Sequence, residues 1–116
     1  MITIIDYGLG NLRSIHNMLD RAGIESVVSR DLDILHTASK LILPGVGNFR
    51  FGMDSLQKLD LIDVLTERVL KARVPILGIC LGAQLLGRRS DEGNCKGLGW
   101  IPMDTVVFDR SISELK

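Results

Sequence analysis

The hydrophobic pattern divides the chain into short apolar runs that alternate with helically spaced apolar positions. Runs within residues 2–6, 26–29, 41–43 and 74–79 are rich in Ile, Leu and Val, and they predict strands. Pro75 removes one backbone donor near the start of the last run, which a strand tolerates at its first position. The chain is therefore expected to place several short strands at intervals that leave room for helices.

Helical spacing of apolar residues fills the intervals after the first and third runs. The first helix is expected to start after Asn11, which suits an N-cap, and to end near Gly23, which suits a left-handed C-terminal residue. The second lies between residues 51 and 73, with an expected break near Asp60. After Gly87 the signal weakens, and residues 105–108 predict one more strand.

The alternation of strands and helices predicts an α/β fold with a doubly wound parallel sheet. Parallel neighbours need a crossover connection, and continuous apolar strands fit burial on both faces of a sheet. A chain of 116 residues has room for one hydrophobic core, so residues 1–116 are expected to form one domain.

The charge and cysteine content of the chain argue against several classes of function. Fourteen basic and fourteen acidic side chains give a net charge of zero, which argues against nucleic acid or an anionic membrane as partner. The opening apolar run ends at Asp6, too short for a signal peptide or a spanning segment, so a cytoplasmic protein is expected. Cys80 and Cys95 form no metal-ligand pattern, so free thiols, no metal and no cofactor are expected.

Cys80 stands where the apolar run at residues 74–79 gives way to a helical pattern. With Gly78 and Gly82 on either side, it forms the thiol version of the G-x-S-x-G nucleophile elbow, whose small neighbours allow a sharp turn. Backbone N–H groups there stabilise a thiolate, and the N–H of Leu81 would point toward an oxyanion. The alternative is a buried core cysteine, since free cysteine is often fully buried.

A second glycine turn, Pro44-Gly45-Val46-Gly47, ends the run at residues 41–43. In a parallel sheet it would lie at the same edge as Cys80 and could offer the second oxyanion donor that acyl chemistry needs. Glycine-rich turns after strands are common, so this turn alone is only suggestive. A phosphate site is a weaker interpretation, because neither a P-loop nor GxGxxG is present.

Four segments taken together resemble the class I glutamine amidotransferases. They are Asp6-Tyr7-Gly8 with Asn11-Leu12, LPGVG at residues 43–47, GICLGAQLL at residues 78–86, and SDEG at residues 90–93. Within the family, these segments and residues 87–102 are most similar to the glutaminase subunits of imidazole glycerol phosphate synthases. The resemblance covers the whole chain and implies the family's sheet with a nucleophile elbow, incomplete at its C-terminal end.

The resemblance implies hydrolysis of glutamine to glutamate and ammonia, with the ammonia delivered to a (β/α)8-barrel cyclase or synthase subunit in histidine biosynthesis. Cys80 would form the γ-glutamyl thioester, and Val46, Gly47 and Leu81 would frame the oxyanion hole. Gln84 and Glu92 match positions that hold the amide and amino groups of glutamine. Without the resemblance, Gln84 would be a helix-surface residue and Glu92 a solvated loop charge. No cofactor is implied.

The base that such a thiol needs is not apparent. A nucleophile of this kind is normally activated by a histidine that a carboxylate orients. His16 falls in the first predicted helix and His36 in a polar stretch, and neither lies in the H-x-E segment that the family places well after the nucleophile. The chain by itself is therefore expected to be inactive, with part of its sheet unpaired and one face partly uncovered.

Three alternatives to a histidine-pathway glutaminase remain open. The first is a non-catalytic remnant that docks on a synthase subunit. The second is a related glutaminase that supplies ammonia for amidino-sugar synthesis. The third is a cysteine-elbow hydrolase or chaperone-like protein whose thiol depends on an acidic residue instead of histidine.

Overall fold

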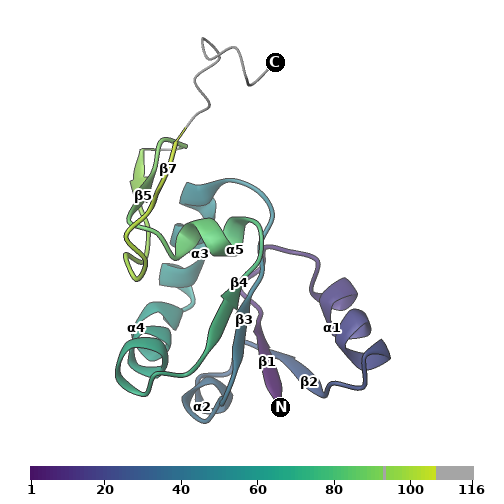
Figure 1. The fold of residues 1–116 in the computed structure, drawn as a ribbon. Helices are drawn as coiled ribbons and strands as arrows, with labels where there is room; N and C mark the ends of the chain where they lie inside the picture. Colours follow the sequence, from purple (N-terminus) through teal and green to yellow (C-terminus); the bar gives the residue numbers. More distant parts are fainter. Residues whose placement is uncertain (93, 107–116) are drawn as a thin grey trace.

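The architecture is a four-stranded parallel sheet with helices on both faces (Figure 1). The computed structural model describes residues 1–92 and 94–106. The strand order is β2-β1-β3-β4, which requires a crossover at every connection. The strands are β1 (Ile2–Ile5), β2 (Ser26–Ser29), β3 (Leu41–Leu43) and β4 (Ile76–Gly78). The predicted doubly wound α/β class is confirmed.

The two faces of the sheet carry different helices. Alternate strand residues point to opposite sides, so Ile5, Leu41 and Leu43 join the larger core, while Ile4 and Ile42 join the smaller one. The larger core packs against α2 (Leu32–His36), α3 (Phe49–Lys58), α4 (Leu61–Thr66) and α5 (Leu81–Leu85). The smaller core is covered by α1 (Leu12–Arg21). A π-helical turn (Glu67–Lys71) continues α4.

Local signals place the helix ends where the sequence predicted them. The Asn11 side chain accepts a hydrogen bond from the Ser14 N–H at 3.3 Å and caps α1. Gly23 follows α1 with a φ of +74°. Asp60, with a φ of 56°, separates α3 from α4, as expected for a left-handed residue between two helices. These residues therefore determine where the crossover helices begin and end.

Four details differ from the predictions. The polar stretch that holds His36 forms the short helix α2, which was not predicted. The strand predicted at residues 74–79 is shorter, because β4 begins only after Pro75. The strand predicted at residues 105–108 is β7 (Asp104–Thr105) in the described part, and residues 107–108 lie outside it. A second, three-stranded sheet was not predicted: β5 (Arg89–Ser90) pairs with β7 and with β6 (Cys95–Lys96). Two-residue strands are too short to give a hydrophobic pattern.

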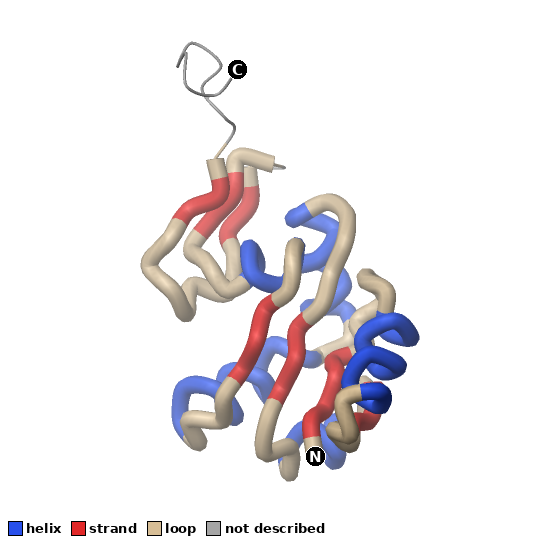
Figure 2. Tube along the Cα trace, turned by 45° about the vertical axis from the view of Figure 1, so that its right-hand side comes forward, coloured by secondary structure: helices blue, strands red, loops and turns tan. Residues whose placement is uncertain are grey.

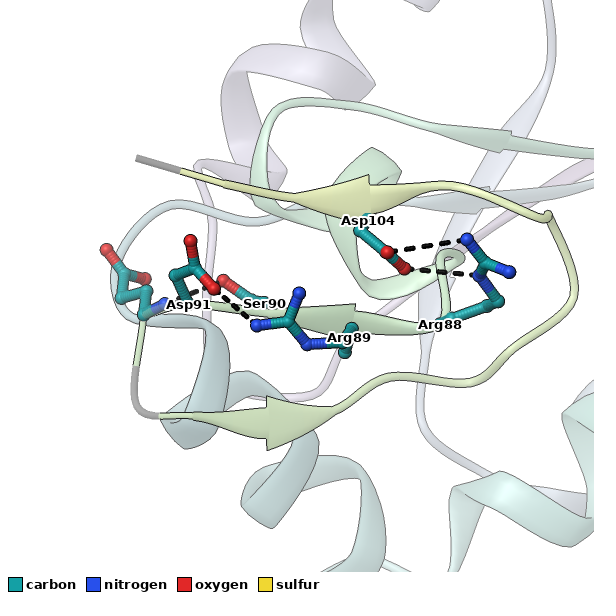
Figure 3. Close-up of polar contacts among 6 residues, drawn as sticks. Arg88, Arg89, Ser90, Asp91 and Asp104 are labelled. Atoms are coloured by element: carbon teal, nitrogen blue, oxygen red, sulfur yellow. Dashed lines mark hydrogen bonds and ion pairs between the residues drawn. The ribbon is translucent and has the colours of Figure 1, made fainter. Parts of the chain in front are cut away.

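The small sheet sits beyond the carboxyl ends of the main strands (Figure 1). Exposed ion pairs lie on the small sheet. The Arg88 Nε is 3.1 Å from an Asp104 carboxylate oxygen, and Arg89 pairs with Asp91 (Figure 3). These exposed pairs contribute little stability, about 0–1 kcal/mol each. Backbone bonds carry more of the attachment, including Leu98 N–H to the Leu85 carbonyl at 2.8 Å. The small sheet is thus fixed to the end of α5.

Among residues 1–92 and 94–106, no helix has the length and apolar character needed to cross a membrane. The predicted single domain over residues 1–116 stays a prediction, since residue 93 and residues 107–116 lie outside the described part.

Candidate active site

Cys80 occupies a strained backbone conformation between β4 and α5. Its φ of 53° and ψ of −119° fall outside the regions that residues with a Cβ prefer. Behind it the turn closes tightly, with the Gly82 N–H bonded to the Ile79 carbonyl at 2.9 Å and the Ala83 N–H bonded to the Cys80 carbonyl at 3.0 Å. The Cys80 side chain is exposed, so it is not a core cysteine. The geometry is that of a nucleophile elbow.

The glycines on either side of Cys80 are required by close backbone contacts. A Cβ on Gly78 would lie 2.6 Å from the Ala83 Cα, and a Cβ on Gly82 would lie 1.8 Å from the Leu43 carbonyl oxygen. Neither contact could be relieved by turning a flexible side chain, because both partners are backbone atoms. The structure therefore supplies the physical reason for the G-x-C-x-G spacing.

The loop after β3 packs directly against the elbow. A Cβ on Gly45 would lie 2.2 Å from the Tyr7 hydroxyl and 3.0 Å from the Leu81 Cβ, so glycine is again needed there. The Tyr7 hydroxyl donates a hydrogen bond to the Pro44 carbonyl, and Tyr7 is fully buried. Burial raises the pKa of Tyr7, so its hydroxyl stays protonated as the donor. Tyr7 thus anchors the base of the loop.

The three residues expected to frame an oxyanion hole lie at this loop and elbow. The Leu81 N–H donates to the Gly45 carbonyl at 3.1 Å, so in this conformation it is engaged within the protein. Val46 is 59% exposed at the tip of the loop. Gly47 has a φ of +116°, and nothing lies within 4 Å of the place where a Cβ would be. The tip is therefore open to solvent, while the donor on Leu81 is released only if the Gly45 peptide moves.

Gln84 and Glu92 lie in different surroundings. Gln84 is half-buried on α5, one turn beyond Cys80, and its N–H bonds to the Cys80 carbonyl at 3.3 Å. Glu92 follows β5, and its carboxylate accepts a hydrogen bond from the Phe49 N–H at 2.6 Å. Its own N–H bonds to the Oγ of the fully buried Ser90 at 3.0 Å. The sequence offered no signal for the Glu92–Phe49 contact, because 43 residues separate the two partners.

The hydrogen bond between Glu92 and Phe49 joins the small sheet to the start of α3. Phe49 is the first residue of α3, where backbone N–H groups have no partner within the helix. The Asn48 side chain accepts from the Arg50 N–H at 2.8 Å and from the Phe51 N–H, and Glu92 supplies the remaining acceptor. Because α3 follows directly on the glycine loop, Glu92 helps to fix the loop's far end.

Glu92→Ala is expected to lower the free energy of unfolding by about 1 kcal/mol, because it removes a carboxylate from a helix N-terminus. Glu92→Gln keeps an acceptor oxygen and should lose about half as much. Urea unfolding, with hydrogen exchange of the Phe49 amide, checks both values. Equal stability of Glu92→Ala and the unchanged chain would contradict the contact.

Neither histidine lies at the edge of the sheet that carries Cys80. The His16 Nδ1 is 2.8 Å from the Oγ of Ser26, which begins β2. His36 ends α2, ahead of the start of β3. Both positions belong to the amino-terminal edge of the parallel sheet, whereas Cys80 follows the carboxyl end of β4. A histidine base for Cys80 is thus not found within residues 1–92 and 94–106.

The sequence model of the family "Glutamine amidotransferase class-I" matches residues 3–98. The imidazole glycerol phosphate synthase subunit HisH 2 of Pseudomonas aeruginosa is 54% identical over 110 residues, which cover 95% of this chain and 54% of that protein. The subunit of the same name from Methanococcus maripaludis is 50% identical, over 96% of this chain and 55% of that protein.

A solved structure described as a glutamine amidotransferase has the same fold. It superposes with a TM-score of 0.77 at 22% identity, over 91% of this chain and 56% of that one. The chain thus spans about half the length of the curated relatives and of the solved structure that it matches.

Proposed function

Because the chain belongs to the class I glutamine amidotransferase family, we propose that Cys80 is the nucleophile of a glutaminase site. The observation that carries the proposal is the strained, exposed elbow, since its conformation costs about 1–3 kcal/mol while the Cys80 side chain stays exposed. A core cysteine would not need two glycines held against backbone atoms.

The reaction proposed for this site is acyl transfer from glutamine to the thiol. The Cys80 Sγ loses its proton and forms a bond to the side-chain carbonyl carbon, the C–N bond breaks, and the proton lost by the thiol passes to the nitrogen, which leaves as ammonia. Water then cleaves the thioester, which releases glutamate and restores the thiol. The transient oxyanion needs N–H donors, and we assign them to Leu81 and the Val46–Gly47 segment. This assignment requires the Gly45 carbonyl to release the Leu81 N–H.

We assign Gln84 and Glu92 to glutamine binding on the family match alone. For Glu92 the Oε1 atom accepts the hydrogen bond from the Phe49 N–H, and the second oxygen of the same carboxylate is the acceptor that we assign to the ammonium group of the substrate.

We further propose that the chain is part of a glutaminase subunit that forms a heterodimer with a (β/α)8-barrel cyclase and supplies it with ammonia for histidine biosynthesis. It rests on the names of the relatives. A supply of ammonia for amidino-sugar synthesis is the second candidate. Co-elution of the chain with a purified imidazole glycerol phosphate synthase cyclase subunit supports the first, and absence of co-elution argues against it.

Release of ammonia from glutamine tests the chemistry. His16 and His36 lie at the opposite edge of the sheet, so we expect the chain alone to release ammonia no faster than Cys80→Ala. Addition of a polypeptide that supplies the second half of the domain should restore release to the unchanged chain but not to Cys80→Ala. Release at equal rates from both in the presence of that polypeptide would contradict the assignment of the nucleophile.

A further inference from the structure

The segment Asp6-Tyr7-Gly8 takes no part in the reaction proposed above, yet it lies at the same edge of the sheet as Cys80. Tyr7 comes after β1, the glycine loop (residues 44–47) after β3 and the elbow after β4, and these three parallel strands are neighbours. Figure 2 shows the loops that follow β3 and β4 side by side beyond the sheet. Tyr7 is therefore placed to act on the loop that we assign to the oxyanion.

The Tyr7 hydroxyl holds the first peptide of the glycine loop. It donates a hydrogen bond to the Pro44 carbonyl from a ring that is fully buried. Gly45 packs so closely that an added Cβ would lie 2.2 Å from this hydroxyl. A second segment reaches the same peptide, since a Cβ on Gly10 would lie 3.2 Å from the Gly45 nitrogen. The peptide between Pro44 and Gly45 is thus held by a hydrogen bond and by close packing.

The next peptide, between Gly45 and Val46, is the one that has to move. Its carbonyl accepts the hydrogen bond from the Leu81 N–H at 3.1 Å, so it occupies a donor that the reaction needs. Val46 is exposed, and nothing lies within 4 Å of a Cβ built on Gly47, so the loop tip has room to adjust. Because a planar peptide turns about the single bonds on either side, a fixed first peptide confines the movement to the second.

We propose that Tyr7 is a positioning residue for the oxyanion site, an inference that rests on the proposed glutaminase function. Its hydroxyl fixes the Pro44–Gly45 peptide, so that a turn of the Gly45–Val46 peptide releases the Leu81 N–H while the loop stays beside Cys80. Without the hydroxyl, the Pro44 carbonyl loses its donor and the base of the loop shifts. Displaced donors stabilise an oxyanion less, because hydrogen bonds weaken steeply with poor distance and angle.

Ser55 supplies the matched control variant. Its Oγ, from α3, donates a hydrogen bond to the main-chain carbonyl of Tyr7. Tyr7→Phe and Ser55→Ala each remove one hydroxyl and one hydrogen bond from this cluster, but only Tyr7→Phe frees the Pro44 carbonyl. Both variants should lower the urea midpoint, and they should differ in what happens at the loop.

Hydrogen exchange measures the loop directly. In Tyr7→Phe the Leu81 amide should exchange at least about tenfold faster than in the unchanged chain, because the Gly45 carbonyl no longer has a fixed position. The Ile79 amide, bonded to a β3 carbonyl at 3.0 Å, should change only as much as the global stability does. Ser55→Ala should change both amides by the same factor. Equal factors for the two amides in Tyr7→Phe would overturn the proposal.

Labelling of Cys80 measures the effect on reactivity. The diazo-ketone glutamine analogue carries a carbonyl that the oxyanion donors polarise, whereas iodoacetamide alkylates an accessible thiolate by displacement of iodide. Tyr7→Phe should slow the diazo-ketone about tenfold and leave the iodoacetamide rate unchanged, and Ser55→Ala should change neither. Equal diazo-ketone rates in the two variants would overturn the role of Tyr7. Failure of the diazo-ketone to label the unchanged chain would instead contradict the glutaminase site, and the exchange of the Leu81 amide would still decide whether Tyr7 fixes the loop.

Discussion

Replacement of Gly82 by alanine is expected to lower the free energy of unfolding by at least about 3 kcal/mol. The added Cβ would lie 1.8 Å from the Leu43 carbonyl oxygen and 3.0 Å from the Pro44 carbonyl oxygen. The carbonyl of Leu43 also accepts the hydrogen bond from the Ile79 N–H, so moving it would disturb the pairing of β3 with β4. Urea unfolding followed by circular dichroism measures the loss.

Gly23→Ala is the matched control for this prediction. Gly23 also stands at a helix end, with a φ of +74°, but nothing lies within 4 Å of an added Cβ. Gly23→Ala should therefore lower the free energy of unfolding only by the strain of the left-handed conformation, about 1 kcal/mol. If Gly82→Ala lost no more stability than Gly23→Ala, the close approach of the elbow to β3 would be wrong.

Cys80→Gly and Cys80→Ala are both expected to abolish covalent modification by a glutamine-analogue diazo-ketone, yet they should differ in stability. Alanine keeps the Cβ and with it the strain at a φ of 53°, so the free energy of unfolding should stay unchanged. Glycine relieves strain of about 1–3 kcal/mol but costs about 0.5–1 kcal/mol in chain entropy, for a net gain of about 1 kcal/mol.

A stability gain on loss of the reactive group would mark Cys80 as a residue held in place for chemistry. Thermal unfolding of the two variants and the unchanged chain gives the comparison. A loss of stability in Cys80→Gly, as large as that from emptying a packed core position, would contradict the strain and favour a packing role.

The main sheet could be predicted from the sequence because its signals are local. The runs that became β1 and β3 are short and apolar and end at Asp6 and Pro44, and Gly23 and Asp60 fall where helices end. The small sheet could not be predicted, because each of its strands spans two residues and depends on backbone bonds between separate segments, such as Asp91 N–H to the Thr105 carbonyl.

In the candidate site, too, some features could be predicted from the sequence and others could not. Cys80 and its glycines form one continuous segment, so their spacing alone predicted the elbow, and the structure explains that spacing by backbone contacts. The bond of Leu81 to Gly45 and the contact of Glu92 with Phe49 depend on how distant segments meet. Those contacts are properties of the folded chain, and the spacing of residues does not encode them.

The most direct test of Cys80 as the nucleophile is the site of covalent modification by the diazo-ketone glutamine analogue, read by mass spectrometry of peptides. We expect modification at Cys80, slowed by excess glutamine, with Cys95 as the internal comparison because it is half-buried in β6. Modification of Cys95 in preference to Cys80, or modification of Cys80 that glutamine does not slow, would contradict it.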